Sequence, residues 1–237
     1  MIPDHLPDNI LLIDKPAGMT SFDVIRQLRR QTGIKKFGHA GTLDPAATGL
    51  LVLGVGPGTK QLSSYIALDK VYDAVIMLGE ARTTGDMDGV VEHAVDVPMG
   101  RVTTTVVSSA VAAMVGTHEL PVSAYSAIKK AGVPMYVRAR EAAKRGDVVA
   151  DVPRRPMRVD HVELHSVTER VIDGQGRVFV TVSFSVGSGT YIRSLAVAVG
   201  AAVGYPAVLY SLRRTRVGEF TLRDAVDVTS VQQLEIV

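Results

Sequence analysis

Apolar and polar residues follow two different spacings along this chain, and both predict regular structure. Short apolar runs at residues 10–13 (ILLI) and 50–55 (LLVLGV) are typical of strands buried in a sheet. Residues 178–186 are apolar at every even position and mostly Thr or Ser between them, which predicts a strand with one buried face. Residues 71–79 (VYDAVIMLG) predict a further strand.

Helical spacing of apolar residues predicts three helices. The first is expected to begin at Thr20 or Ser21, either of which can cap it, and to end at Gly33. The second covers residues 103–115, and the third follows Gly189. The residues that form one apolar face on these helices are Phe22, Ile25 and Leu28; Val107, Ala110, Val111 and Met114; and Ile192, Leu195, Ala196 and Val199.

Composition narrows the class of protein. Hydrophobic residues make up 46% of the 237 residues and charged residues 21%, which predicts a packed globular core. No repeat or linker stands out, so we expect one mixed α/β domain over residues 1–237. No apolar run approaches about 18 residues, and the first residues are acidic rather than basic, so we expect no membrane span, no signal peptide and a cytoplasmic protein. The absence of cysteine excludes disulfides, thiolate nucleophiles and thiolate-bound metals.

Charge is more informative in its distribution than in its total, because the net charge is only +2. Three basic clusters stand out, and each alone is equally compatible with a solvated surface. They are the first cluster (Arg26, Arg29, Arg30, Lys35 and Lys36), the middle cluster (Lys129, Lys130, Arg138, Arg140, Lys144, Arg145, Arg154, Arg155 and Arg158) and the last cluster (Arg213, Arg214 and Arg216). Together they favour a polyanionic partner.

Common cofactor and metal motifs do not fit this chain. The segment GVGPGTK at 54–60 has neither the spacing of a P-loop nor that of a dinucleotide-binding turn. His161 and His165 lie four residues apart, but in a strand-like segment with no third ligand nearby in the sequence. No nucleophilic serine motif is present. We therefore expect no cofactor and no catalytic metal.

Asp44 is the most conspicuous candidate for chemistry. It stands between Leu43 and Pro45 in a segment, residues 38–56, that holds five glycines and no other acid. A residue before proline is restricted to extended geometry, so Pro45 helps to fix the direction of the Asp44 side chain. An aspartate that only caps the following turn is the alternative. Arg193, near a predicted helix start, is a cation that could pair with a loop carboxylate, which suggests cofactor-free chemistry on a nucleic-acid base or sugar.

Several segments in the right order carry a close resemblance to a known family. They are DKPAGMTS (14–21), GHAGTLDPAATGLLVLGVGPGTK (38–60), KVYDAVIMLG (70–79), TTGDMDG (83–89), YSAIKKAGVPMYVRAR (125–140), GSGTYIRSLA (187–196) and LRRTRVGEF (212–220). The chain resembles the bacterial tRNA pseudouridine-55 synthases, the TruB family.

The resemblance implies a fold and a reaction. The fold is the pseudouridine-synthase α/β fold, a mixed and largely antiparallel sheet with flanking helices and a central cleft that holds Asp44. The enzyme is an isomerase that breaks the N1–C1′ bond of a T-loop uridine in tRNA, turns the base and rejoins it through C5, without cofactor or metal. The uridine must first be flipped out of the folded loop.

The resemblance also implies roles for particular residues. Asp44 matches the essential aspartate, acting either as a nucleophile on C1′ or as a base that removes the 2′ proton. Arg193 matches the arginine that pairs with it, and Tyr72 the tyrosine that stacks on the flipped base. Tyr191 matches a second active-site tyrosine. His39 matches the histidine that enters the T-loop where the base has left.

Four further positions match residues that line the cleft or contact the RNA. They are Lys15, Asp86, Lys129 and Leu212, of which Leu212 matches an apolar contact near the base. Outside the resemblance, the residues alone favour an ordinary strand aromatic for Tyr72, a turn lysine for Lys15 and part of a solvated acidic turn with Asp88 for Asp86. They favour a hydrogen-bonded loop histidine for His39.

Departures from the family pattern are small near Asp44. Ala40 stands where a threonine is usual, Val186 where a cysteine is usual and Ala198 where an aspartate is usual, and residues 120–126 lack a second proline. The chain stops shortly after residue 220, where many members continue into an RNA-binding PUA domain. We therefore expect a single catalytic domain without PUA and a weaker grip on tRNA. Nothing in the sequence demands more than a monomer, so we expect a monomer. A non-catalytic tRNA-folding chaperone and a synthase for uridines in another RNA are the alternative functions.

Overall fold

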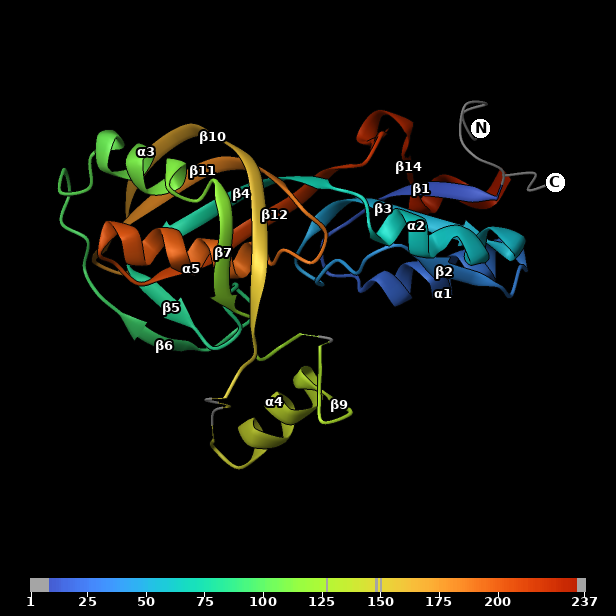
Figure 1. Ribbon diagram of the computed structural model, residues 1–237, viewed down its shortest axis with the longest axis horizontal. Coiled ribbons are helices and arrows are strands. Elements are labelled where there is room, and N and C mark those ends of the chain that lie inside the picture. Colours follow the sequence, from blue (N-terminus) through green and yellow to red (C-terminus); the bar gives the residue numbers. More distant parts are fainter. Residues whose placement is uncertain (1–8, 127, 148, 150, 234–237) are drawn as a thin grey trace. The chain divides into compact units, whose positions relative to one another are not determined.

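The computed structural model describes residues 9–126, 128–147, 149 and 151–233 (Figure 1). The first eight residues lie outside the described residues. They belong to the acidic N-terminal segment from which we expect no signal peptide and a cytoplasmic location. The described chain forms two compact units, unit 1 from residues 1–73 and 212–237 and unit 2 from residues 74–211. Both units mix strands with helices, which confirms the predicted α/β class. The expectation of a single domain stays a prediction.

Unit 1 contains two segments of sequence. The first segment provides β1 (Ile10–Lys15), α1 (Ser21–Thr32), β2 (Phe37–His39), β3 (Thr48–Val55), η1 (Gly56–Gln61), α2 (Leu62–Ile66) and the start of β4 (Lys70–Leu78). The second provides the end of β12 (Ala207–Val217), then β13 (Phe220–Thr221), η2 (Leu222–Asp224), β14 (Val226–Asp227) and η3 (Val228–Gln233). The strand order is β14-β1-β3-β12, with β2 also paired to β3 and β13 to β12.

Both faces of the unit 1 sheet are buried, which explains the uninterrupted apolar runs in β1 and β3. Leu11 and Ile13 point to one face, where they pack with Val24, Ile25 and Leu28 of α1. The alternate residues of β1 and β3 point to the opposite face; they are Ile10, Leu12, Leu50 and Val52, and they pack with Leu62 and Val217. A strand covered on both sides needs apolar residues at every position, so the periodicity of two disappears.

Helix α1 begins and ends where the sequence predicts. Thr20 is the N-cap and forms a capping box with Asp23, while Gly33 adopts a left-handed conformation with φ of 73° at the C-terminus. Ile25 and Leu28 are buried as expected, but Phe22 is 65% exposed, so its predicted place on the buried face is wrong. The buried side of the helix is centred on Val24 and Leu28, and Phe22 lies across the helix from Val24.

Unit 2 contains the remaining elements. They are the end of β4, β5 (Glu80–Arg82), β6 (Val91–Ala94), α3 (Thr104–Ala112), β7 (Gly116–Pro121), β8 (Lys129–Lys130), β9 (Val133–Pro134), α4 (Met135–Lys144), β10 (Arg154–Ile172), β11 (Gln175–Val186), α5 (Ile192–Val203) and the start of β12. The strand order is β12-β4-β11-β10-β7. The predicted strand at 178–186 is the buried part of the longer β11, which forms an antiparallel hairpin with β10.

The two predicted helices of unit 2 are present and pack against each other (Figure 1). Helix α3 is capped by Thr103 and buries Val107, Ala110 and Val111, and α5 buries Leu195 and the other apolar residues of its predicted face. No helix among the described residues is long and apolar enough to cross a membrane.

Candidate active site

The Asp44 loop, residues 40–47 between β2 and β3, is fixed on both sides of its carboxylate. Leu43 and Ala47 are each only 3% exposed, while Asp44 between them is half-buried. The buried Ser21 hydroxyl donates to the Leu43 carbonyl at 3.3 Å and accepts from the Leu43 amide at 3.0 Å. The Ala47 amide donates to the Asp44 carbonyl at 3.1 Å. The loop therefore holds the Asp44 backbone between two anchored neighbours.

Lys15 joins this loop to the turn that precedes α1. Its side chain is fully buried, and its ammonium donates to the carbonyls of Pro16 (2.9 Å), Met19 (2.7 Å) and Pro45 (3.2 Å). The Gly18 amide donates to the same Pro45 carbonyl at 2.8 Å. A buried ammonium that satisfies three carbonyls places a positive charge beside the residue that follows Asp44.

Arg214 supports the loop from β12. Its guanidinium is 1% exposed and donates to the Leu50 carbonyl at 2.8 Å and to the Gly41 carbonyl at 3.1 Å. Gly49 lies against the Arg214 backbone with a φ of +101°, and a Cβ there would stand 2.2 Å from the Arg214 carbonyl oxygen. Only glycine allows this close approach. The Gly49 contact and the hydrogen bond to Gly41 therefore hold the two ends of the loop to β12.

Buried cations give the Asp44 loop a positive electrostatic environment. Burial is the main reason why the pKa of Lys15 falls from 10.5 to about 8; Arg214 lowers it further, and the Asp44 carboxylate opposes the fall. Burial, then Arg214, also holds the pKa of His39 below its usual value of 6.5. Because the attraction between Lys15 and Asp44 is mutual, it stabilises the carboxylate in its charged form.

His39 lies at the end of β2, at the start of the Asp44 loop. Its ring meets the exposed Phe22 ring edge-on, with centroids 5.3 Å apart and planes 81° apart. Its Nδ1 atom is buried and makes no hydrogen bond with any residue that the structure describes. The alternative of a hydrogen-bonded loop histidine therefore finds no support at Nδ1.

Tyr72 and Leu212 complete the predicted residues of unit 1. Tyr72 lies on β4 and is 9% exposed. Leu212 lies on β12, half-buried, and its carbonyl accepts from the Thr48 hydroxyl at 3.5 Å. Unit 1 therefore holds five of the predicted site residues. Among them, Lys15 lies close enough to Asp44 for the Asp44 carboxylate to raise the pKa of Lys15.

Arg193 is the centre of the predicted residues in unit 2. It lies in the first turn of α5 and is 6% exposed. One of its nitrogens donates to the Thr84 carbonyl at 2.9 Å and the Ser123 hydroxyl at 3.1 Å, and the other donates to the Tyr125 carbonyl at 3.0 Å. The Asp86 carboxylate lies 3.4 Å from the first nitrogen.

Asp86 is not part of a solvated acidic turn, because it is 8% exposed. Its Oδ1 accepts from the Thr84 hydroxyl at 2.5 Å and from the Asp88 amide at 3.2 Å, and its Oδ2 faces Arg193. Tyr191 immediately precedes α5 and is half-buried. Asp86, Arg193 and Tyr191 thus belong to unit 2, and the pairing of Arg193 with Asp44 stays a prediction.

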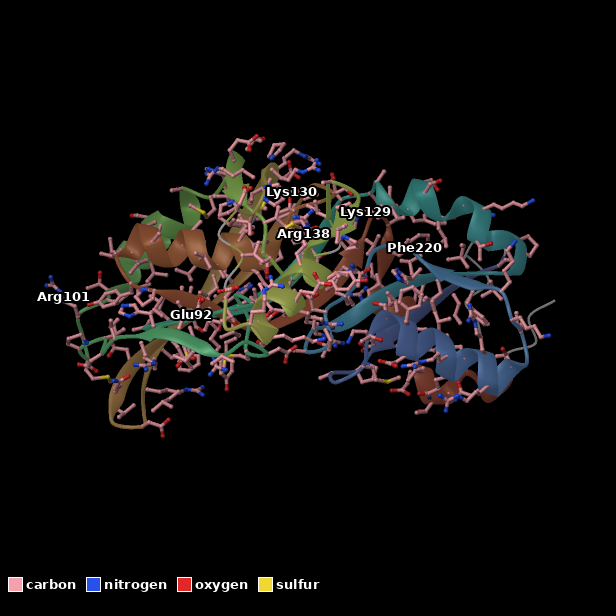
Figure 2. All side chains as sticks on the ribbon, turned by 90° about the horizontal axis from the view of Figure 1, so that it is seen from below. Glu92, Arg101, Lys129, Lys130, Arg138 and Phe220 are labelled. Carbon is pink, nitrogen blue, oxygen red and sulfur yellow. The ribbon has the colours of Figure 1, made fainter. Side chains whose placement is uncertain are left out.

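Lys129 lies apart from Arg193 along the chain, on the two-residue strand β8, and is exposed (Figure 2). Beside it, the Lys130 carbonyl accepts from Arg138 of α4 at 2.9 Å, and the Lys130 ammonium pairs with Asp151. Most of the middle basic cluster is exposed, and all of the first cluster is. Both clusters therefore remain available to a polyanion.

The last basic cluster differs from the exposed surface that the sequence predicts. Arg214 is buried, Arg213 is half-buried and forms a two-point ion pair with Asp14, at 3.1 and 2.6 Å, and Arg216 is exposed. Arg214 therefore holds β12 to β3 and to the Asp44 loop instead of forming a surface for RNA, and Arg213 holds β12 to Asp14 of β1.

A cavity of about 400 Å³ in unit 2 borders Arg193. Its lining comes from Thr84, from the Pro121–Tyr125 segment and from the outer side of α5. Among the described residues, no group of three His, Asp or Glu side chains is arranged to hold a metal ion.

Comparison with known proteins identifies the family. Residues 29–192 match the profile described as TruB family pseudouridylate synthase (N terminal domain). A protein of Corynebacterium efficiens named tRNA pseudouridine synthase B is 43% identical over 223 residues, covering 94% of this chain and 71% of that protein. One of the same name from Mycobacterium sp. (strain KMS) is 46% identical over 216 residues, covering 91% and 69%. The chain belongs to the TruB family of pseudouridylate synthases.

Solved structures agree with this family at the level of the fold. The chain is similar to a chain in the structure of an H/ACA RNP bound to a substrate RNA containing 2′-deoxyuridine, with a TM-score of 0.62, 23% identity and coverage of 94% of this chain and 52% of that one. An archaeal box H/ACA sRNP Nop10–Cbf5 complex contains a chain with a TM-score of 0.62 and 24% identity, covering 98% and 57%. The pseudouridine-synthase fold predicted from the sequence is confirmed.

Sequence reasoning missed three residues that support the site. Ser21 and Arg214 both hold the Asp44 loop, and Arg82 holds the Asp86 loop. The sequence predicts Ser21 only as a possible helix cap and Arg214 only as part of a surface basic cluster. Their positions in TruB-like segments were the available signal, but their burial depends on contacts between elements far apart in the sequence.

Proposed function

We propose that this protein is a tRNA pseudouridine synthase that isomerises the T-loop uridine at position 55. Membership of the TruB family and the curated relatives named tRNA pseudouridine synthase B support this function. The observation that carries it within the structure is the Asp44 loop, which holds a single carboxylate between anchored neighbours beside a buried ammonium. Tyr72, Arg193 and Tyr191 supply the other groups that the family chemistry uses.

The proposed reaction is a balanced isomerisation that needs no redox partner. The uridine N1–C1′ bond breaks, the base turns, and a C1′–C5 bond forms. The C5 hydrogen then leaves as a proton, and N1 gains one. Asp44 assists either by attacking C1′ or by removing the 2′ proton, and both roles require the charged carboxylate. Lys15 contributes by stabilising that charge.

The flipped base needs compensation for the stacking that it loses. Extrusion costs a few kcal/mol, and stacking on one aromatic ring returns about 1–3 kcal/mol. We assign this stacking to Tyr72, with Leu212 as an apolar contact and Tyr191 beside the sugar. Arg193, held by Thr84, Ser123, Tyr125 and Asp86, is the cation that pairs with Asp44.

Recognition of tRNA falls to His39 and the basic clusters. His39 enters the T-loop at the place that the flipped base leaves, while Lys129 and the two exposed clusters contact phosphates. Because these groups all come from one chain, we propose a monomer that works without a cofactor or protein partner, in the cytoplasm where tRNA is modified.

The test is to convert an unmodified tRNA transcript and map pseudouridine by carbodiimide labelling and primer extension. The proposal predicts a stop at the T-loop uridine and none in a transcript whose T-loop uridine is replaced by cytidine. A stop at other RNA uridines alone would favour the synthase with a different substrate. Binding and refolding of tRNA without any stop would favour the chaperone.

A further inference from the structure

The loop that carries Asp86, residues 83–89, is held by hydrogen bonds within the loop and by hydrogen bonds from residues outside it. Thr84 satisfies Asp86 through its hydroxyl, and the Gly89 amide donates to the Asp86 carbonyl at 3.2 Å. Gly89 fits against this closed turn so tightly that a Cβ would stand 2.4 Å from the Thr84 hydroxyl oxygen. The Gly85 carbonyl accepts from the Leu209 amide at 3.0 Å, which anchors the first half of the loop.

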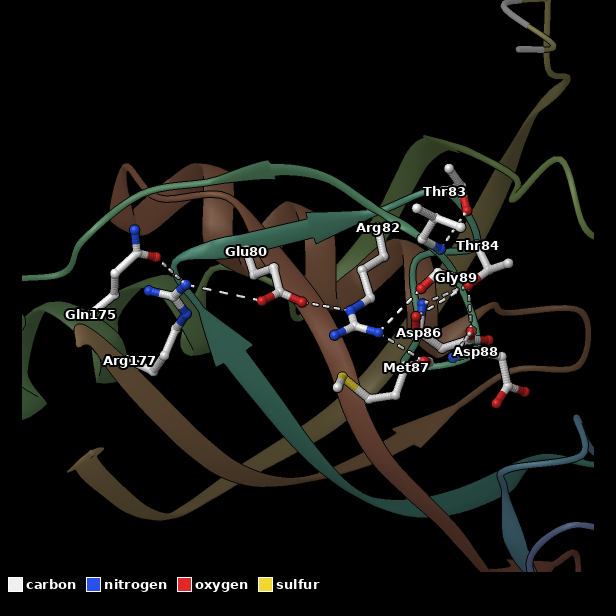
Figure 3. A network of polar contacts seen from close by, with 11 residues as sticks. Glu80, Arg82, Thr83, Thr84, Asp86, Met87, Asp88, Gly89, Gln175 and Arg177 are labelled. Atoms are coloured by element: carbon white, nitrogen blue, oxygen red, sulfur yellow. Dashed lines mark hydrogen bonds and ion pairs between the residues drawn. The ribbon is translucent and has the colours of Figure 1, made fainter. Parts of the chain in front are cut away.

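Arg82 anchors the second half. One of its terminal nitrogens donates to the Met87 carbonyl at 3.0 Å and to the Gly89 carbonyl at 3.1 Å (Figure 3). Its Nε donates to the Glu80 carboxylate at 2.5 Å. One guanidinium of β5 thus connects the Met87 and Gly89 carbonyls to the Glu80 carboxylate at the start of the same strand.

Glu80 is itself fixed from the other side. Its second carboxylate oxygen lies 4.0 Å from Arg177 of β11, whose side chain is 5% exposed. Arg177 donates to the carbonyls of Val95 (3.0 Å) and Gly176 (2.9 Å) and to the Gln175 side chain (2.6 Å), all away from the Asp86 loop. Figure 3 shows this row of side chains running from Gln175 through Glu80 to the loop at Asp86.

We propose that Arg82 is a positioning residue for the synthase reaction, acting through the Asp86 loop on Arg193. Arg193 receives its placement from two parts of that loop, the Thr84 carbonyl at 2.9 Å and the Asp86 carboxylate at 3.4 Å. A guanidinium that fixes Met87 and Gly89 therefore fixes the geometry of the cation expected to pair with the catalytic carboxylate. Misplacement of such a group by about 1 Å is enough to slow an enzyme about a hundredfold.

The central experiment compares Arg82→Met with wild type in single-turnover and steady-state assays on tRNA transcript. Methionine keeps much of the side-chain volume but removes every donor. We expect kcat to fall about ten- to a hundredfold while KM for tRNA changes less than threefold, because the guanidinium of Arg82 donates to Glu80, Met87 and Gly89 of the protein itself. Arg82→Lys, which keeps one charged donor, should recover part of the lost kcat.

Arg177→Met is the matched control, because Arg177 forms an ion pair with the same glutamate at 4.0 Å but donates to none of the carbonyls of the Asp86 loop. It should lower the melting temperature at least as much as Arg82→Met and leave kcat within threefold of wild type. The second control is Asp86→Asn, in which the partner of Arg193 is already altered. Adding Arg82→Met to Asp86→Asn should cost less than threefold more, since both substitutions act on the same guanidinium.

The inference fails if Arg82→Met lowers the melting temperature but keeps full kcat at temperatures where it is folded. It also fails if the Arg82 and Asp86 effects simply multiply. Because the inference rests on the proposed function, wild-type turnover is measured first. An inactive wild type overturns the function, whereas an active wild type with a fully active Arg82→Met variant overturns only the positioning role.

Discussion

Lys15 and Lys70 are two buried lysines of unit 1 that differ in the acid beside them. Burial lowers the pKa of each to about 8, with Arg214 lowering it further, but Asp44 opposes the shift at Lys15 and Asp69 opposes it at Lys70. The Lys70 ammonium donates to the carbonyls of Ile66 and Leu68 at the end of α2. A comparison of the two lysines therefore separates the effect of any buried ammonium from the effect of an ammonium beside Asp44.

The pH dependence of activity should identify Lys15. Because its pKa is about 8, its charge is present below pH 8 and lost above it, and with it the stabilisation of the Asp44 carboxylate. We expect kcat to decline as the pH rises through about 8. Lys15→Met should have a low kcat that does not decline as the pH rises through 8. Lys70→Met should still show the decline. Single-turnover rates between pH 6 and 10 measure this.

The stability of the fold should change in the opposite direction over the same range. A lysine with a folded pKa near 8 and an unfolded pKa of 10.5 takes up more protons in the unfolded state between these values. The unfavourable contribution of Lys15 is thus complete below pH 8 and disappears as the pH rises to 10.5. Loss of activity above pH 8 together with a loss of stability in wild type, but not in Lys15→Met, would contradict this account.

Gly49 and Gly18 test how closely β12 supports the Asp44 loop. Both have positive φ, but a Cβ at Gly49 would collide with the Arg214 backbone, whereas nothing lies within 4 Å of a Cβ at Gly18. Gly18→Ala should cost about 1–2 kcal/mol of unfolding free energy from backbone strain alone. Gly49→Ala should cost about 3 kcal/mol or more, since overpacking adds to the strain. Urea unfolding measures both, and equal costs would contradict the close approach.

At the scale of single elements, α1 combines structural and functional faces. Its buried side packs on the unit 1 sheet, while Arg26, Arg29 and Arg30 are exposed on the side that also carries Phe22. The ring of Phe22 contacts the ring of His39, the residue expected to enter the T-loop of tRNA. The exposed side of α1 is therefore continuous with that residue. We interpret the exposed side of α1 as a phosphate-contacting surface.

The salt dependence of tRNA binding tests this interpretation. Each lost phosphate contact should reduce the slope of log affinity against log salt by about one. Arg30→Gln should therefore weaken binding at low salt more than at high salt, and to unrelated RNA as much as to tRNA. Arg101→Gln, an exposed arginine of unit 2 outside the basic clusters, is the control and should change neither. An unchanged slope for Arg30→Gln would remove α1 from the interface.

The elements differ in how far local sequence determines them. Helix α1 is predicted from local signals, its start to within one residue at Thr20 or Ser21 and its end at Gly33, and the structure places the cap at Thr20. Strand β12 was not predicted, because its arginines read as a solvated surface until Asp14 and the carbonyls of Gly41 and Leu50 are seen to satisfy them. Phe22 was misplaced because helical spacing alone does not tell which side of a helix faces the core.

At the scale of the whole molecule, β4 and β12 each have residues in both compact units. We therefore propose that the chain unfolds as one domain. Hydrogen exchange in increasing urea should give the same midpoint for peptides of β1 and β3 in unit 1 and of β11 in unit 2. Separate midpoints would show two folding domains and contradict the single-domain prediction.

The candidate site follows the same division between local and distant information. The Asp44 segment was recognisable from its sequence, because a lone carboxylate before proline among small residues is a local pattern. Its supports Ser21 and Arg214 were not, since they reach it from other segments of unit 1, and Lys15 was assigned only through the family resemblance. Residues such as Tyr72 and Lys129 were assigned only through the family resemblance, because neither has a local feature that indicates its role.

The most direct test of the central claim is release of tritium from tRNA transcript labelled with [5-³H]uridine. Isomerisation replaces the C5–H bond of the target uridine by the new glycosidic bond, so each turnover releases one C5 hydrogen. We predict release of one equivalent per tRNA by wild type and by Asp173→Asn, an isosteric change in the exposed tip of the β10–β11 hairpin, and none by Asp44→Asn. Release by Asp44→Asn at the wild-type rate, or no release by folded, tRNA-bound wild type, would contradict the account.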